Sequence, residues 1–167
     1  MEKQAQNFIN LYNEQGEKHG YWEYYYENGQ LMSKGHYVNG KREGYWEFYH
    51  SNGQLMRKGN YVNGSEDGYW EWYYSCGQLS RKGNFVNDKR EGDWESYYRN
   101  GQLESKGNWV NGKRDGYWED YYSCGQLLRK GNYVNGEFIK EKEQTELTMD
   151  EIAEKFGIPV NQLKIKK

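Results

Sequence analysis

The side chains that could support acid–base or nucleophilic chemistry are few and scattered along the chain. His19, His36 and His50 are the histidines, and Cys76 and Cys124 each precede a glycine. Metal sites and activated thiols need several ligands, or a base, held close together. No such cluster is visible at a suitable spacing. The sequence therefore predicts no catalytic residue, no metal site and no cofactor, and it predicts that the chain is not an enzyme.

Aromatic residues are the other chemically distinctive group, and they recur with a fixed period of 24 residues. Five copies of a repeat extend from Gly20 to Ile139, and each copy opens with a glycine, which we count as position 1. Repetition at this period is typical of an array whose copies share one continuous core. Position 3 is always a tryptophan, and we expect this row to form the structural core. The row consists of Trp22, Trp46, Trp70, Trp94 and Trp118.

Each copy has the pattern of a β-hairpin, because two runs rich in aromatic and β-branched residues flank a short turn. Asn28-Gly29, like the same dipeptide in two other copies, predicts a two-residue type I′ turn in which both residues have positive φ. The predicted facing pairs of the first copy are Trp22 with Gly35, Glu23 with Lys34, Tyr24 with Ser33, and Tyr26 with Leu31. In this register the glycine leaves room for an indole ring, and the glutamate and lysine rows form a solvated ladder.

The connection from one copy to the next, Asn39 to Gly44, is compatible with a tight turn or with a longer loop. In both cases the hairpins add side by side. We therefore predict a mainly β fold, an elongated single-layer antiparallel sheet of five hairpin repeats with a short C-terminal helical cap. Residues 1–19 are expected to form an N-terminal half-repeat or cap, residues 20–139 the five repeats, and residues 140–167 a strand–helix appendage.

The C-terminal segment has the pattern of a helix rather than of the repeat. Thr148 fits an N-cap, Asp150 and Glu151 fall in the first turn, and Gly157 fits a C-cap. The segment weakly resembles the first helix of small helix-turn-helix or LysM-like modules. A helix-turn-helix needs a recognition helix after the turn, and the pattern beyond Gly157 does not show one. We therefore favour a packing cap over DNA binding.

The repeat resembles the MORN repeat in a bacterial variant form, with the pattern G-x-W-x-x-Y-Y-x-N-G-x-L-x-x-x-G-x-Y-x-N-G-K. The resemblance covers Gly20 to Ile139 and is specific in its glycines and aromatic residues. It implies a row of hairpins that form one elongated sheet, and a scaffold for protein interactions. Some bacterial members look like antitoxin or immunity components, whereas lipid binding is not general. Ser65, Asp88 and Asp93 depart from the pattern, so that the copies are not strictly equivalent.

Charge and cysteine content narrow the range of partners and compartments. The net charge is −2, and residues Gly20 to Gly136 contain equal numbers of acidic and basic side chains. This balance disfavours nucleic acid, which needs a basic stripe, and makes a membrane an unlikely partner. We expect a cytoplasmic protein with two free cysteines, because no apolar leader or spanning segment is visible and the two turns lie too far apart for a disulfide. A homo-oligomer is compatible with the single-layer sheet.

The positions that vary between copies predict where a partner binds. Position 5 is aromatic in the first three copies and polar in the last two, and we expect it to lie on the partly open core face. Position 13, which begins with Met32 and Met56, is expected on the opposite face. An exposed aromatic patch is a plausible surface for a protein. The predicted partner-binding residues are Tyr24, Phe48 and Trp72, flanked by Tyr26, His50 and Tyr74.

The predicted function is a non-catalytic repeat scaffold that binds another protein, in the form of an antitoxin or immunity-type inhibitor if the resemblance extends that far. The alternative is a saccharide- or choline-binding repeat protein, because aromatic cages bind quaternary ammonium groups. Against this alternative, such repeats carry a second Gly-Trp, and this chain has Lys58 to Tyr61 at the corresponding place.

Overall fold

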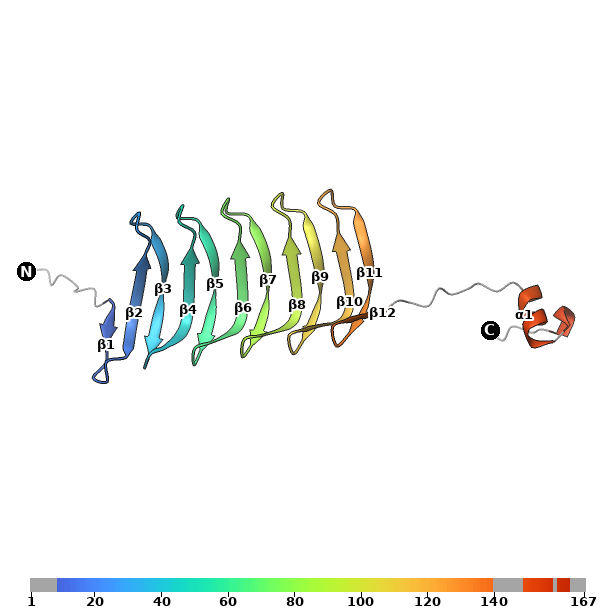
Figure 1. The fold of residues 1–167 in the computed structure, drawn as a ribbon, viewed down its shortest axis with the longest axis horizontal. Helices are drawn as coiled ribbons and strands as arrows, with labels where there is room; N and C mark the ends of the chain where they lie inside the picture. Colours follow the sequence, from blue (N-terminus) through green and yellow to red (C-terminus); the bar gives the residue numbers. More distant parts are fainter. Residues whose placement is uncertain (1–8, 140–148, 158, 163–167) are drawn as a thin grey trace, which may run out of the picture.

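The computed structural model describes residues 9–139, 149–157 and 159–162. Within these residues twelve strands form one antiparallel sheet, and each strand lies beside its neighbours in sequence (Figure 1). The strands are β1 (Leu11–Tyr12), β2 (Lys18–Tyr25), β3 (Leu31–Val38), β4 (Lys41–Tyr49), β5 (Leu55–Val62), β6 (Ser65–Tyr73), β7 (Leu79–Val86), β8 (Lys89–Tyr97), β9 (Leu103–Val110), β10 (Lys113–Tyr121), β11 (Leu127–Val134) and β12 (Glu137–Ile139). The predicted fold class, an open sheet of five hairpin repeats with a short C-terminal helix, is confirmed.

The turn inside each hairpin is longer than predicted. In the first repeat the Gly29 N–H donates to the Tyr26 carbonyl at 2.9 Å, and the Tyr26 N–H donates to the Gln30 carbonyl at 2.9 Å. Gly29 has a φ of 81°, whereas Asn28 does not have a positive φ. The Asn28 side chain instead accepts a hydrogen bond from the Gln30 N–H at 3.1 Å. The prediction of a two-residue type I′ turn at Asn28-Gly29 is therefore wrong.

The two-residue type I′ turns lie between the hairpins. Asn39 and Gly40 have φ values of 47° and 76°, and Val38 faces Lys41 directly across them. Asparagine and glycine tolerate this left-handed backbone better than other residues do. Asp88 takes the second place of this turn in the third repeat with a φ of 63°. The sequence was compatible with a tight turn or a longer loop between the hairpins, and the structure has the tight turn.

The register within each hairpin follows the prediction along most of the strand and departs from it near the turn. The pairs found as predicted are Trp22 with Gly35, Glu23 with Lys34, and Tyr24 with Ser33. The register then shifts, so that Leu31 faces Tyr25 and not Tyr26. The predicted pair of Tyr26 with Leu31 is therefore wrong. Such a bulge leaves one residue, here Met32, unpaired and re-aims the side chains on its turn side.

In the second to fifth repeats, the core tryptophan covers a glycine of the preceding repeat. A Cβ added to Gly35 would lie 2.3 Å from the indole ring of Trp46. The glycine thus leaves room for an indole, as predicted, but the ring comes from the next repeat and not from the facing Trp22. Trp46 Nε1 also donates to the His36 carbonyl at 3.0 Å. The same close approach joins Gly59 to Trp70, Gly83 to Trp94, and Gly107 to Trp118.

The opposite face carries the ladder of lysines and glutamates. Lys34 Nζ lies 2.8 Å from a carboxylate oxygen of Glu47, so the lysine forms its ion pair with the next repeat and not with the facing Glu23. Lys58 with Glu71, Lys82 with Glu95, and Lys106 with Glu119 repeat this geometry. Burial alone would raise the pKa of Glu47, but hydrogen bonds from Lys34 and Tyr49 outweigh burial and lower the pKa.

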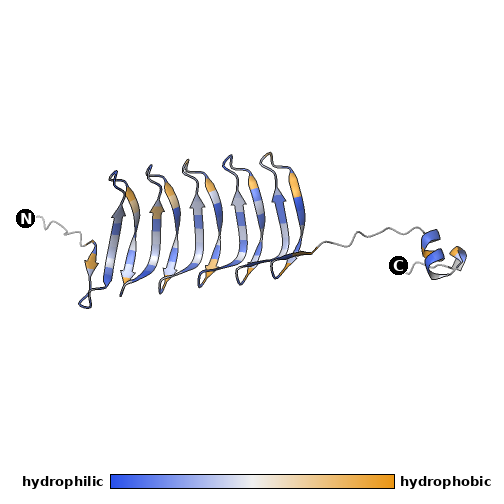
Figure 2. Cartoon of the chain, viewed as in Figure 1, coloured by the Kyte–Doolittle hydropathy of each residue, from blue (hydrophilic) through white to orange (hydrophobic). Residues whose placement is uncertain are grey.

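The core lies in the middle of the strands, although hydropathy does not reveal it. Figure 2 shows the most hydrophobic residues near the strand ends, while the middles of the strands are pale or blue. Tryptophan and tyrosine have intermediate hydropathy, yet they dominate the buried set. The side chains of Trp46 and Trp70 are completely buried. The array is therefore held together by ring packing rather than by aliphatic side chains.

Short strands and one helix occupy the two ends of the described chain. Leu11 in β1 pairs with His19 in β2. At the other end the Phe138 ring of β12 covers Gly131, where a Cβ would approach it to 2.7 Å, and so takes the place of a further tryptophan. Helix α1 (Met149–Phe156) is followed by Gly157 at a φ of 62°, which fits the predicted C-cap, and by a 3-10 helix, Val160–Gln162. Thr148, with residues 140–148, lies outside the described residues, and the predicted cap over the sheet stays a prediction.

Candidate functional site

Aromatic rings and arginines gather on one face of the sheet. Positions 3, 5 and 18 supply the rings, positions 14 and 23 supply most of the cations, and we call this surface the arginine–aromatic face. Over the second and third repeats the rings at positions 3 and 5 form a continuous stack. Its centroid distances are 5.8 Å for Trp46–Phe48, 6.5 Å for Phe48–Trp70, 5.9 Å for Trp70–Trp72 and 5.5 Å for Trp72–Trp94. Each position-5 ring therefore lies between its own tryptophan and the next one.

The predicted aromatic patch lies on this face but is not exposed as expected. Phe48 and Trp72 are only 7% and 8% exposed, and Tyr24 is half-buried. The Arg57 guanidinium lies 4.1 Å from the Phe48 centroid, and that of Arg81 lies 4.6 Å from the Trp72 centroid. The expected exposure of Phe48 and Trp72 is wrong, because each ring is sandwiched between tryptophans and covered by an arginine. Guanidinium groups therefore lie over both rings.

The three predicted flanking residues connect neighbouring repeats. The hydroxyls of Tyr26 and Tyr74 each donate to a backbone carbonyl of the next hairpin at 2.7 Å, that of Tyr49 and that of Tyr97 respectively. His50 places Nε2 3.0 Å from the corresponding carbonyl of Tyr73. All three side chains are half-buried. They hold the hairpins in register, and only their outer edges remain accessible.

The stack of rings stops at the fourth repeat. Position 5 is Ser96 there, and its hydroxyl lies 2.7 Å from the hydroxyl of Ser105 on the facing strand. In the fifth repeat Asp120 takes this position and is 9% exposed. Its carboxylate lies 2.6 Å from Arg129 Nε and 3.5 Å from Arg114 Nη1. Two small or charged side chains thus replace two rings, and Ser96 leaves the space between Trp94 and Trp118 without one.

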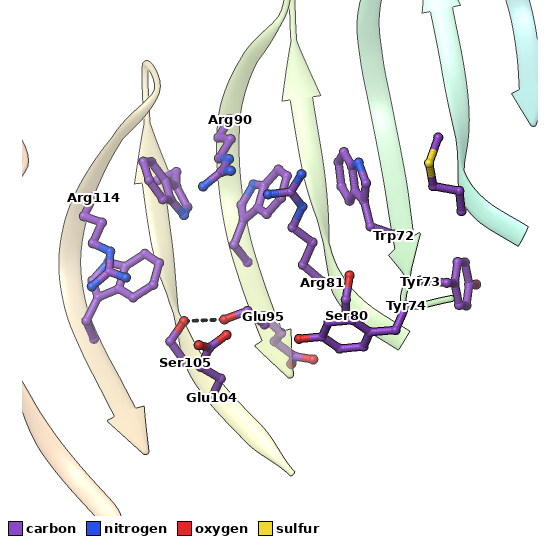
Figure 3. A pocket seen from close by; sticks show the side chains of 15 residues that line it. Trp72, Tyr73, Tyr74, Ser80, Arg81, Arg90, Glu95, Glu104, Ser105 and Arg114 are labelled. Carbon is purple, nitrogen blue, oxygen red and sulfur yellow. Dashed lines mark hydrogen bonds between the residues drawn. The ribbon is translucent and has the colours of Figure 1, made fainter. Parts of the chain in front are cut away.

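A pocket of about 410 Å³ occupies the place of the missing ring. Trp94, Trp118, Ser96 and Ser105 line its floor and walls, together with Trp72 and Trp109. Figure 3 shows Arg81, Arg90 and Arg114 in the upper part of the pocket, and Ser80, Glu104 and Ser105 in the lower part. Pockets that combine aromatic walls with a few polar groups are the usual form of a binding site. This pocket is our candidate functional site.

The sequence did not place position 13 in this site. Met56, Ser80 and Glu104 line the pocket, so position 13 shares the face of position 5. The prediction that the two rows lie on opposite faces is wrong. The bulge after Tyr24 and its equivalents moves position 13 across the sheet, and it follows from the longer turn. Recognising that Asn-Gly belonged to a three-residue loop between Tyr26 and Gln30 would have brought the two rows together.

Two arginines of the pocket have no acidic partner among the described residues. Arg57 pairs with Glu66 at 2.6 Å and Arg114 with Asp120, whereas Arg81 and Arg90 make only ring contacts. The Arg90 guanidinium lies 4.7 Å from the centroids of both Trp94 and Trp109. Burial lowers the pKa of Arg90, and the positive charges of Arg81 and Arg114 lower it further. Like charges therefore face one another across the site.

Other candidate chemistry is sparse within the described part of the chain. No group of three or more histidine, cysteine, aspartate or glutamate side chains there could hold a metal ion. Cys76 and Cys124 are free and exposed, in agreement with the expectation from their spacing. Hydrogen bonds from the Gln78 backbone and from Arg99 lower the pKa of the Cys76 thiol. No helix in the described residues has the length and apolar character needed to cross a membrane.

Comparisons with known proteins agree with the repeat geometry. A comparison with curated proteins gives no match. A family model described as MORN repeat variant matches residues 18–39, 42–63, 66–87, 90–111 and 114–135. Each match spans the hairpin from the strand that opens the repeat to the type I′ turn that closes it, and together the matches cover more than half of the chain. The chain belongs to the MORN repeat variant family.

Proposed function

We propose that the chain is a non-catalytic scaffold that binds a partner protein through its arginine–aromatic face. The observation that carries this proposal is the pocket of the fourth repeat, where Arg81 and Arg90 lie beside tryptophan walls and form no ion pair with any residue that the structure describes. Tryptophan and arginine are the residues most enriched at the centre of protein interfaces. An antitoxin or immunity-type inhibitor would use the same face to cover the working surface of its partner.

The charges on the arginine–aromatic face favour a protein over the other partner classes. Glu66, Glu104 and Asp120 interrupt the arginines, so the face does not offer the continuous basic stripe that a nucleic-acid backbone needs. Three arginines in the pocket would repel a quaternary ammonium group, which disfavours the choline-binding alternative. Two free, exposed cysteines support our proposal that the protein works in the reducing cytoplasm.

Affinity purification with paired baits tests the proposal. Tagged wild-type protein and the double variant R81E/R90E are used as baits in the native lysate, and the captured proteins are quantified. We expect one protein to be enriched at near-equal molar amount with the wild type and to fall at least tenfold with the variant, since reversed charges repel its surface. Purified partner then reproduces the difference by calorimetry.

A control and a competing surface complete this test. Lys41→Glu and Lys113→Glu alter exposed charges away from the pocket and should leave capture unchanged. Wild-type protein that captures no protein at stoichiometric amount, and instead floats with vesicles of phosphatidylcholine and phosphatidylserine, would overturn the proposal in favour of a membrane surface. Equal capture by wild type and R81E/R90E would show that the partner uses another face.

A further inference from the structure

The space between Trp94 and Trp118 has the shape of a missing aromatic residue. In the second and third repeats, Phe48 and Trp72 fill the equivalent space between successive tryptophans. In the fourth repeat Ser96 leaves this space open, and the pocket of about 410 Å³ takes its place. The walls are already built for a planar ring, because stacking surfaces lie on both sides.

The facing residue shows that the fourth repeat can accommodate a ring at this point. In the first repeat the position-5 ring of Tyr24 faces a buried Ser33. In the fourth repeat the facing residue is again a buried serine, Ser105. Ser96 therefore stands where a ring facing the buried serine would fit.

The charges around this space indicate which groups should flank the ring of a bound segment. Arg81 is exposed, Arg90 is half-buried, and neither has an ion pair in the described part of the chain. Glu104 lies on the other side of the pocket and is half-buried. Arg114 forms an ion pair with Asp120. Two unpaired guanidinium groups at the rim match carboxylates, which they can bind through two parallel hydrogen bonds.

We propose that the pocket takes an aromatic side chain of the partner protein that is flanked by carboxylates. The ring enters between Trp94 and Trp118 and restores the stack, and the flanking carboxylates pair with Arg81 and Arg90. This inference rests on the proposed function and names the chemistry of the segment that is bound. The Ser96 and Ser105 hydroxyls, which also line the pocket, share one hydrogen bond with each other.

Short peptides test separately the insertion of the aromatic ring and the pairing of the carboxylates with the arginines. The probe is acetyl-Gly-Asp-Phe-Glu-Gly-amide, and its controls replace Phe by Ala, or Asp and Glu by Asn and Gln. Binding is followed by NMR through the indole N–H signals of Trp94 and Trp118. We expect saturable shifts for the probe, roughly tenfold weaker binding for the Ala control and roughly a hundredfold weaker binding for the Asn/Gln control, since the ring contact and each of the two charge-assisted pairs are worth about 1.4 kcal/mol.

Two variants connect the peptide binding to named residues. Ser96→Tyr recreates the Tyr24 and Ser33 pair of the first repeat, fills the space and should abolish binding of the probe while raising the midpoint of thermal unfolding. Arg81→Gln should weaken binding of the acidic probe roughly tenfold and leave binding of the Asn/Gln control peptide unchanged, because only one charge pair is lost. Arg57→Gln is the matched control, since Arg57 holds the same repeat position outside the pocket.

Each remaining outcome decides one of the two proposals. No shift at about 2 mM probe, or unchanged binding by Ser96→Tyr, would overturn the pocket proposal. Ser96→Tyr that captures the lysate partner as well as wild type does would also overturn it, while leaving the scaffold proposal intact. Probe binding in the absence of any captured protein supports the pocket and counts against the scaffold proposal alone.

Discussion

In the second and third repeats the fifth residue is a ring held between two tryptophans, whereas in the fourth and fifth repeats it is a serine or an aspartate. The backbone is the same in both regions, since the strand registers repeat. The connected core of buried residues runs from Trp22 to Trp94 and does not extend to Trp118. The second and third repeats thus have a continuously packed aromatic core. The fourth and fifth repeats have less ring packing and a more open, charged surface.

The largest expected difference between the regions concerns the core tryptophans. Trp70→Ala removes a completely buried ring that stacks on Phe48 and Trp72, and we expect it to lower the free energy of unfolding by about 4–5 kcal/mol. Trp118→Ala removes a ring that is also buried but meets the rings of Trp109 and Tyr133 edge-on, and we expect a loss of about 3 kcal/mol. Urea unfolding followed by circular dichroism measures both. Equal losses would contradict the comparison.

Phe48→Ser transfers the fourth-repeat arrangement to the second repeat. The change empties the space between Trp46 and Trp70, and we expect it to cost about 3 kcal/mol, because a buried ring is lost and a cavity remains. Amide hydrogen exchange should show faster opening of β4 and β5 than of β8 and β9. If exchange accelerates evenly along the sheet, the stack does not carry the local stability that we attribute to it.

Asp120→Asn tests the ionic replacement for the ring in the fifth repeat. The variant keeps the shape but removes the charge that faces Arg129 and Arg114, and we expect a loss of about 2 kcal/mol because the carboxylate is buried and hydrogen-bonded. Thermal unfolding at low and high salt measures the effect. Glu43→Gln, a carboxylate outside this cluster, is the control and should cost less than half as much.

The smallest expected effect is a pH dependence shared by both regions. Hydrogen bonds from Lys82 and Tyr97 lower the pKa of Glu95 below its ordinary value of 4.5. The unfolded state therefore binds protons first, and the stabilisation present above about pH 4.5 is lost as the pH falls through the lower folded value. Stability measured from pH 6 to pH 3 should decline, and less so in Glu95→Gln. A rise in stability over this range would contradict the ladder's role.

The repeating positions were predictable from the sequence, because the period indicates an array of hairpins, the glycines indicate turns and the tryptophans indicate a core. The facing of Trp22 and Gly35 and the run of hairpins follow from them. The turn type did not follow, since Asn-Gly occurs in both connections, and the two turns differ in their hydrogen bonds and in the φ of the asparagine, which the dipeptide alone does not reveal. That single ambiguity also hid the shared face of positions 5 and 13.

The site itself was only partly predictable. The change from rings to polar residues at position 5 was visible, and it marks the edge of the pocket. The sequence did not show which tryptophan covers each glycine. The predicted strand pairing does not decide whether the indole comes from the same repeat or from the next one. The burial of Phe48 under Arg57 depends on that assignment, and so does the space beside Ser96.

Because each glycine that is covered by a tryptophan precedes that tryptophan in the sequence, the contacts between repeats can form in order from the N-terminus to the C-terminus. Gly35 remains uncovered until Trp46, eleven residues later, has been synthesised, and the same spacing separates Gly59 from Trp70, so each contact between repeats can form soon after its first residue has been added to the chain. Contacts of such short range form quickly and need no distant segment. The sheet can therefore assemble during translation, one hairpin at a time, with every new tryptophan closing the hairpin before it.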